Sequence, residues 1–284
     1  IRKYVAIWVL ATVLCVIDVM PAALAGPFDN WSSQTLGNDI ILLQRHGTFF
    51  INQLLNVNVV KIQAGKGGYR FKIGCVPGKR LKTSEMCRRS GAHAGINGGF
   101  FSFLAGDSLS YLKVNGKTLY SNGRDADSRG MQENGAILIT PEGQLRIEKA
   151  GADSDYEKNH RLADVLLAGP LLICDNDLQQ IKADNRQPRS ALGITSTGEV
   201  LLLTVDGRNP KSEGVSLKEL QRMMDEMDCD YAVNLDGGDS TTLWVNLDGG
   251  KVVNIPCGEG GKPGPENERP VATCLLLLKN GKRR

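Results

Sequence analysis

The sequence is poor in histidine, and this limits the enzyme mechanisms that it can support. Only His46, His93 and His160 are present, and their spacing does not fit the H-E-x-x-H pattern of zinc hydrolases. Residues 238–240 read Gly-Asp-Ser, which matches the nucleophile sequence of one esterase class, but that mechanism needs a histidine base, and none follows His160. His93 lies among small residues and is expected to be packed rather than catalytic. A phosphate-binding loop of the G-x-x-x-x-G-K-S/T type is also absent, which argues against P-loop chemistry.

Basic residues interleaved with aromatics, which would indicate a nucleic-acid surface, are also missing. The chain has 34 lysines and arginines against 31 aspartates and glutamates, a net charge of +3, and its basic residues are scattered. We therefore expect no nucleic-acid partner.

The sequence has one long apolar run, and it lies at the start. Arg2 and Lys3 precede the apolar residues 4–19, and residues 23–25 read Ala-Leu-Ala, a pattern typical of a cleavage site. We predict a signal peptide over residues 1–25 and one secreted or periplasmic catalytic domain over residues 26–284. An uncleaved membrane anchor is the alternative, but the run is shorter than the roughly 20 residues of a spanning helix. No other membrane segment is predicted.

Cysteine usage agrees with an oxidising compartment. Of seven cysteines, one lies in the predicted leader, and no C-x-x-C sequence supports a zinc ribbon or a thioredoxin-like site. The even number that remains predicts disulfides without choosing a pairing, and buried thiols are the alternative for Cys174 and Cys274. These six cysteines are Cys75, Cys87, Cys174, Cys229, Cys257 and Cys274.

The most informative segment is residues 234–242, which read Asn-Leu-Asp-Gly-Gly-Asp-Ser-Thr-Thr. It places carboxylates and hydroxyls on a glycine turn directly after an apolar run. Residues 246–250 repeat its first five letters, but this copy joins two β-prone runs and is typical of an ordinary hairpin turn. The context of the first copy, rather than its letters, therefore indicates a site.

Two acidic residues follow the strands of one predicted strand-helix-strand unit. Residues 200–205 are an apolar run that ends at Asp206, residues 216–219 form a capping box before a helical pattern, and a strand at 231–235 ends at Asp236. Such crossovers lay the two strands parallel. We therefore expect both aspartates at the carboxyl-terminal edge of the sheet, where ligands bind in α/β proteins.

A predicted hairpin brings an arginine to the same edge. Residues 189–195 lead into a Thr-Gly turn, and pairing Ser196 with Glu199 places Arg189 opposite Asp206. A guanidinium beside two carboxylates suits an anionic substrate, because its planar fork can hold a phosphate. An ion pair that only braces the end of the sheet is the alternative.

Another polar group follows a small-residue strand upstream. The strand predicted at residues 92–96 stops at Asn97, and Gly98 and Gly99 after it permit close approach of a ligand to the backbone. A sharp turn that directs the next two phenylalanines into the core is the alternative.

Taken in order, these segments resemble the phosphodiester glycosidase family, and the likeness extends from about residue 59 to 278. The matching blocks are residues 97–101 (N-G-G-F-F), 168–172 (around G-P-L), 189–193 (R-x-A-x-G), 206–208 (D-G), 234–241 (N-L-D-G-G-x-S) and 269–271 (R-P-V). The resemblance implies hydrolysis of a sugar 1-phosphodiester, similar to N-acetylglucosamine 1-phosphodiester, between the anomeric carbon and oxygen. The leaving group is then a phosphomonoester.

The resemblance also implies roles for individual residues. Asp236 and Asp206 are expected to form the catalytic carboxylate pair, with their two roles undecided, and Arg189 to clamp the phosphate. Further substrate-binding residues are expected at Asn97, Gly98, Gly99, Arg208, Asn234, Gly237, Gly238, Asp239, Ser240 and Arg269, of which Asn97, Asn234 and Ser240 would orient the substrate through hydrogen bonds.

Asp239 departs from the family pattern, which usually has a third glycine at this position. Either the aspartate tolerates the backbone angles of the turn or the turn has shifted. The added carboxylate would allow a cation to bind, but nothing else supports a divalent ion, and no cofactor is predicted. The departure is the best support for one alternative, a non-catalytic module that binds cell-envelope carbohydrate. A phosphodiesterase that breaks the phosphorus–oxygen bond of a similar substrate is a separate alternative.

The expected fold is α+β: a mixed central β-sheet with one parallel βαβ crossover and flanking helices at residues 83–90 and 216–228. Polar segments at 149–161 and 257–268 are predicted to be loops able to cover a site. Glu268, in the second, is expected to be solvated and is the best of its spare carboxylates for catalysis. The expected partner is a small-molecule or glycan phosphodiester, and the sequence does not indicate an oligomeric state.

Overall fold

The computed structural model describes residues 28–49, 53–63, 68–102, 105–121, 133–151, 156, 158–182, 184–258 and 262–280. The predicted signal peptide therefore lies outside the described residues, as do parts of both predicted covering loops. No helix among the described residues has the length and apolar character that crossing a membrane requires.

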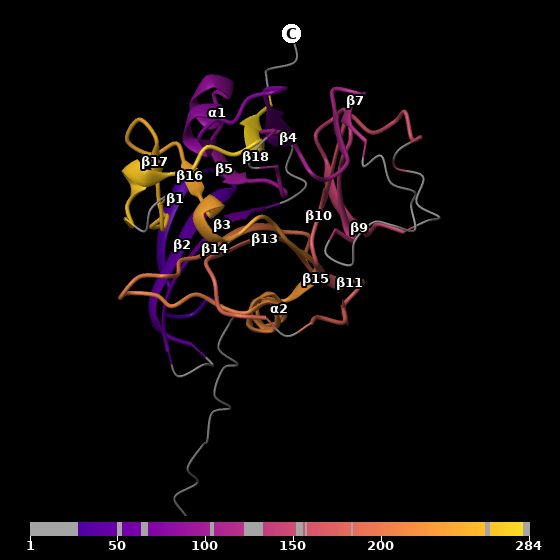
Figure 1. Cartoon of the computed structure of the whole chain (residues 1–284). Helices are drawn as coiled ribbons and strands as arrows, with labels where there is room; N and C mark the ends of the chain where they lie inside the picture. Colours follow the sequence, from indigo (N-terminus) through magenta and orange to yellow (C-terminus); the bar gives the residue numbers. More distant parts are fainter. Residues whose placement is uncertain are drawn as a thin grey trace, which may run out of the picture.

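The described residues form three antiparallel sheets (Figure 1). The first has the strand order β1 (Ser32–Gly37), β2 (Ile40–Thr48), β3 (Leu54–Ile62), β14 (Val200–Val205), β13 (Arg189–Thr195), β15 (Cys229–Asn234), β11 (Leu171–Cys174) and β12 (Asp177–Leu178). The second has the order β7 (Lys117–Tyr120), β6 (Leu112–Val114), β10 (Asp164–Ala168), β8 (Gly135–Ile139) and β9 (Leu145–Lys149). The third has the order β17 (Lys251–Val252), β16 (Leu243–Val245), β5 (Ala94–Asn97), β18 (Thr273–Lys279) and β4 (Tyr69–Cys75).

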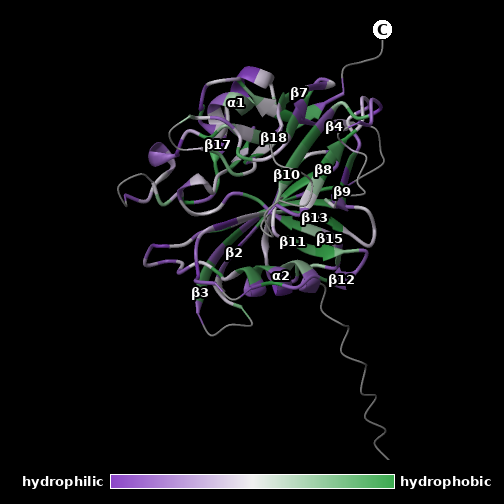
Figure 2. Ribbon diagram, turned by 45° about the vertical axis from the view of Figure 1, so that its right-hand side comes forward, coloured by the Kyte–Doolittle hydropathy of each residue, from purple (hydrophilic) through white to green (hydrophobic). Residues whose placement is uncertain are grey.

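One apolar cluster joins all three sheets. It contains fully buried side chains from each of them, among them Leu42, Leu166, Ile96 and Leu275. Figure 2 shows the same arrangement, with hydrophobic strands in the centre and polar segments outside. Burial of apolar surface on this scale is the main force that holds the sheets together.

The described residues contain two α-helices, at the positions where the sequence predicts helices. Helix α1 (Thr83–Ser90) packs on the third sheet, and α2 (Leu217–Glu226) packs on the first (Figure 1). Helix α2 begins with the predicted capping box, in which Ser216 Oγ accepts from the Glu219 backbone N–H. Its buried face includes Leu220 and Met224. The α+β class is confirmed.

The predicted mixed sheet is wrong, because every strand pair among the described residues is antiparallel. After α2 the chain places β15 on the far side of β13, so β14 and β15 do not pair. Since each is antiparallel to β13, the two strands still run in the same direction. Asp206 and Asp236 therefore follow strand ends at one edge of the sheet.

The register of the β13–β14 hairpin differs by one residue from the prediction. Arg189 pairs with Val205 rather than Asp206. The turn closes between Thr195 and Glu199 and contains three residues, with Gly198 at a φ of 80°. A glycine in this left-handed conformation is typical of a three-residue hairpin loop, which the two-residue prediction did not allow for.

The hairpin predicted around residues 246–250 is confirmed, whereas the predicted disulfides are not formed between the described cysteines. The second Asn-Leu-Asp-Gly-Gly copy, at 246–250, joins β16 to β17. All six cysteines that the structure describes are free thiols. Cys87 and Cys274 share the apolar cluster beneath α1 and are both free thiols, whereas Cys229 lies in a different cluster beneath α2.

Candidate active site

A cavity of about 320 Å³ opens at the edge of the first sheet where β14 and β15 end and β13 begins. Its volume is at the lower end of the range for ligand sites, about 300–1,000 Å³. It is lined by Phe100, Gln187, Arg189, Arg208, Asp236, Gly237, Gly238, Asp239 and Arg269. Most of the predicted charged residues therefore meet here, and the chain brings them from five separate segments.

Asp236 is the carboxylate best placed for chemistry in this cavity. Its backbone N–H donates to Gly98 O at 2.9 Å, and its carbonyl accepts from Asn97 Nδ2 at 2.6 Å. Burial raises the pKa of its carboxyl to about 6, while hydrogen bonding by the Ser240 side chain and the charge of Arg269 oppose that rise. A carboxyl with a pKa near neutrality in a cavity can exchange a proton in either direction.

Asn97 holds the Asp236 loop from below. Its side chain is fully buried, and its Oδ1 accepts from Ser190 Oγ at 2.6 Å and from the Thr242 backbone N–H at 3.1 Å. Both ends of the amide are therefore used inside the protein. Asn97 does not line the cavity, so it positions Asp236 rather than contacting a ligand.

Asp206 lies behind the cavity and does not line it. Its carboxylate is fully buried and accepts from Asn56 Nδ2 at 2.5 Å, from Asn254 Nδ2 at 3.2 Å and from the Ile255 backbone N–H at 3.0 Å. Burial raises its pKa to about 6, and these hydrogen bonds act in the opposite direction. These hydrogen bonds connect the end of β14 to β3 and to residues 254–255. They favour a structural role for Asp206 over a role as proton donor.

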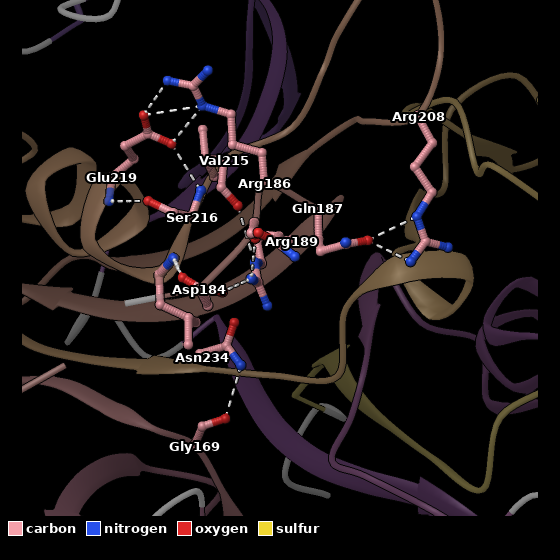
Figure 3. A network of polar contacts seen from close by, with 12 residues as sticks. Gly169, Asp184, Arg186, Gln187, Arg189, Arg208, Val215, Ser216, Glu219 and Asn234 are labelled. Atoms are coloured by element: carbon pink, nitrogen blue, oxygen red, sulfur yellow. Dashed lines mark hydrogen bonds and ion pairs between the residues drawn. The ribbon is translucent and has the colours of Figure 1, made fainter. Parts of the chain in front are cut away.

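Arg189 reaches the cavity wall, but its guanidinium is held by the protein. It forms an ion pair with Asp184, and it donates to the carbonyls of Val215 and Asn185 at 3.1 Å each (Figure 3). Its partner is therefore Asp184 and not Asp206 as the predicted register required. The structure favours the alternative of an ion pair that braces the sheet end.

Arg208 points into the cavity from an unusual backbone position. Its φ of 57° is left-handed, which few non-glycine residues adopt and which is often found at functional sites. Its Nε donates to Gln187 Oε1 at 2.8 Å (Figure 3), and its Nη1 donates to Asp239 Oδ1 at 2.7 Å. About half of the side chain is exposed, so this cation is accessible to a ligand.

Asp239 lies between two arginines. Arg208 contacts one of its oxygens, and Arg269 Nη2 donates to the other at 2.5 Å. The Cys257 thiol donates to Asp239 Oδ1 at 2.9 Å. The pKa of this thiol is raised to about 12, mainly by burial and next by the hydrogen bond to Asp239. The left-handed residue of the turn is Gly238, at a φ of 60°, and Asp239 is not among the residues with positive φ. The aspartate therefore needs no shift of the turn.

The glycines after Asn97 serve close packing. The N–H groups of Gly98 and Gly99 donate to Thr273 O at 2.9 Å and Thr273 Oγ1 at 3.2 Å. A Cβ on Gly98 would lie 2.3 Å from that same hydroxyl oxygen. In the turn after Asp236, the Gly238 N–H donates to Pro188 O at 2.9 Å. These amides are engaged within the protein, which differs from the expectation that glycine-loop amides contact the substrate.

Two other predicted ligand contacts are also structural. Asn234 is buried, and its Nδ2 donates to Gly169 O at 2.8 Å, which links β15 to the turn before β11 (Figure 3). Ser240 is fully buried beneath Asp236. Neither side chain lines the cavity.

The prediction that Glu268 is solvated is wrong. It is 4% exposed and accepts from the Ser84 backbone N–H at 2.8 Å. Ser84 lies in the first turn of α1, whose backbone N–H groups have no partner within the helix. Glu268 therefore caps α1 from a distance and fixes the segment that carries Arg269.

Two cavity residues were not predicted as ligand contacts. Phe100 belongs to the N-G-G-F-F block, for which a turn that directs both phenylalanines into the core was the alternative interpretation, and it forms an apolar wall of the cavity. Gln187 holds Arg208, and no sequence pattern marks it. Within the described ranges, no group of three or more histidine, cysteine, aspartate or glutamate residues is placed to hold a metal ion.

Comparison with known proteins identifies the family that the chain resembles. The sequence model of the phosphodiester glycosidase family matches residues 90–278. The N-acetylglucosamine-1-phosphodiester alpha-N-acetylglucosaminidase of Bos taurus is 27% identical over 191 residues, which cover 61% of this chain and 35% of that protein. The chain thus matches only about a third of the length of this relative.

Two solved structures share the fold. The catalytic domain of the zebrafish enzyme of the same name, auto-inhibited by its pro-peptide, has a TM-score of 0.65 and 17% identity, covering 90% of this chain and 87% of that chain. A hypothetical protein from Synechocystis has a TM-score of 0.62 and 15% identity, covering 88% and 64%. Since the family match extends over most of the chain and includes the segments that build the cavity, this protein belongs to the phosphodiester glycosidase family.

Proposed function

We propose that the protein hydrolyses sugar 1-phosphodiesters, with N-acetylglucosamine 1-phosphodiesters as the model substrate. Water replaces the phosphate at the anomeric carbon, the bond between that carbon and the bridging oxygen breaks, and free sugar and a phosphomonoester leave. The observation that carries the proposal is the meeting of Asp236 with Arg208 and Arg269 in one cavity. The activity for which the bovine relative is named supports the substrate class.

The two arginines supply the anion site in this proposal. Arg208 and Arg269 face the same point of the cavity, where both now contact Asp239. Guanidinium groups bind phosphate oxygens through charge and paired hydrogen bonds. Arg189 contributes by fixing the cavity wall, since its own donors are used by Asp184 and two carbonyls.

Asp236 acts in its ionised form. A phosphomonoester has a second pKa of about 6 and leaves readily when arginines stabilise its charge, so a proton donor adds little. The remaining need is to remove a proton from the attacking water. Because burial raises the pKa of Asp236 to about 6, it is a stronger base than an ordinary aspartate. Asp206 and Asn97 position the segments around it.

Product analysis of a purified preparation tests the proposal. Wild-type protein should release free N-acetylglucosamine and a phosphomonoester, and Asp236→Asn should lower kcat by about 100-fold or more. Asp248→Asn is the matched control, because Asp248 occupies the same place in the second Asn-Leu-Asp-Gly-Gly copy and is exposed. Sugar 1-phosphate as the product would mean phosphorus–oxygen cleavage instead, and saturable binding without any product would mean a non-catalytic module.

We also propose export of the protein, with residues 1–25 removed as a signal peptide and residues 26–284 as one catalytic domain. The charged start, the apolar run and the Ala-Leu-Ala sequence support this. Expression of the whole chain in a secreting host should give a mature protein that begins at Gly26. Recovery of the uncleaved chain from the membrane fraction would favour the anchor.

A further inference from the structure

The carboxylate of Asp239 occupies the position where an anionic ligand would meet the cavity arginines. Its two oxygens accept from Arg208 at 2.7 Å and from Arg269 at 2.5 Å, so one carboxylate bridges two guanidinium groups. Its side chain is about one-fifth exposed and lines the cavity. A phosphate group would form the same kind of contacts with the same donors.

The backbone does not require an aspartate here. The turn at residues 238–240 takes its left-handed angle at Gly238, so position 239 needs no particular residue type for its backbone angles. The neighbouring Cys257 thiol also donates to this carboxylate, which leaves it with three side-chain partners, two of them cationic. The contacts of the Asp239 side chain are therefore mainly electrostatic, with the two arginines as its charged partners.

We propose that Asp239 is a specificity-determining residue, a built-in anion that lowers the affinity of the Arg208–Arg269 site for doubly charged phosphomonoesters. This inference rests on the proposed function of the cavity. Arg208 and Arg269 carry a combined charge of +2, and Asp239 lowers it to +1. This loss weakens the attraction for a phosphomonoester, which approaches two negative charges at neutral pH, more than the attraction for a singly charged phosphodiester.

The consequence concerns substrate and product. A phosphodiester enters with one charge, and the phosphomonoester leaves with up to two. A carboxylate beside the site repels the second species more strongly, since Coulomb energy scales with ligand charge. Asp239 thereby weakens product binding more than substrate binding and favours release of the product.

The test compares two small probes, methyl phosphate and dimethyl phosphate, by titration calorimetry at pH 8. They differ in one methyl group and one charge. If Asp239→Asn strengthens binding of the singly charged dimethyl phosphate about threefold, binding of the doubly charged methyl phosphate should strengthen about tenfold, the square of that factor. Asp239→Gly should change affinity in the same order, and Asp248→Asn, which removes a charge on the surface, should change neither probe.

Several results would overturn the inference. If both Asp239 variants bind methyl phosphate no tighter than wild type, or strengthen both probes equally, Asp239 is only a brace between the loops that carry Arg208 and Arg269. The same holds if Asp248→Asn reproduces the effect. Thermal unfolding of each variant shows that the protein compared is folded. Because the titration needs no turnover, the proposed hydrolysis and the role of Asp239 can fail separately.

Discussion

Replacing Asp206 by asparagine removes a charge from a fully buried position while keeping the shape of the side chain. The pKa of Asp206 is raised to about 6 in the folded protein, mainly by burial, against an ordinary value of 3.8. A raised pKa means that the folded state holds the proton more tightly than the unfolded chain. The stability linked to this group is therefore fully present below pH 3.8 and is lost as pH rises through about 6.

The size of this effect follows from the two pKa values. A difference of about two pH units corresponds to about 3 kcal/mol of unfolding free energy. Urea unfolding of wild type and Asp206→Asn at several pH values should therefore show wild type losing about 3 kcal/mol relative to the variant between about pH 4 and pH 6, and no further change above that. Taking the difference between the two proteins removes the contribution of Asp236, which titrates in the same range.

The Asp206→Asn variant also distinguishes a structural role of Asp206 from a catalytic one. Asp206 accepts hydrogen bonds from Asn56, Asn254 and Ile255, and Asp206→Asn keeps one accepting oxygen. If Asp206 only braces these segments, the folded variant should keep most of its kcat. A loss of kcat of about 100-fold in a fully folded variant would be the size expected for a proton-transferring group, and it would refute the structural role. A pH-independent difference in stability between the two proteins would refute the raised pKa.

Three further substitutions test the support of the site and the fold. Asn97→Ala removes the amide that holds the Asp236 carbonyl and should lower kcat about 100-fold with little change in KM, and an unchanged kcat would count against its positioning role. Ser216→Ala removes the α2 cap and should cost about 1 kcal/mol in urea unfolding, whereas a neutral effect would mean that the capping box is not formed in solution. Gly98→Ala places a methyl group 2.3 Å from a threonine hydroxyl and should destabilise by about 1–3 kcal/mol. Gly151→Ala should not, since no described atom outside its chain neighbours lies within 4 Å of its methyl, and equal effects would contradict the packing argument.

Local sequence patterns predicted the elements that depend on local contacts. The capping box at Ser216 fixed the start of α2, and the apolar runs around residues 200–205 and 231–235 are the strands that carry Asp206 and Asp236. Both aspartates lie at one sheet edge as predicted, although β13 separates their strands. The direction of a strand follows from its connection, but its place in the sheet depends on which neighbour packs best.

Long-range partners were not predictable from the sequence. One extra residue in the turn before Glu199 moved the pairing of Arg189, and its actual partner, Asp184, lies outside any motif. Gln187 carries no sequence signal for its contact with Arg208. Asp239 was marked by its departure from the family pattern, but its two arginine contacts come from segments about 30 residues away in either direction.

The pH dependence of kcat/KM tests the central claim, that Asp236 works as an ionised carboxylate beside the cavity arginines. With an N-acetylglucosamine 1-phosphodiester substrate, kcat/KM should rise with pH through about 6 and then level off, because ionisation of Asp236 activates it. Asp206→Asn should keep this rise, which assigns it to Asp236 rather than to the second carboxyl of similar pKa. A kcat/KM that falls through pH 6, or a rise that survives in Asp236→Asn, would contradict the account.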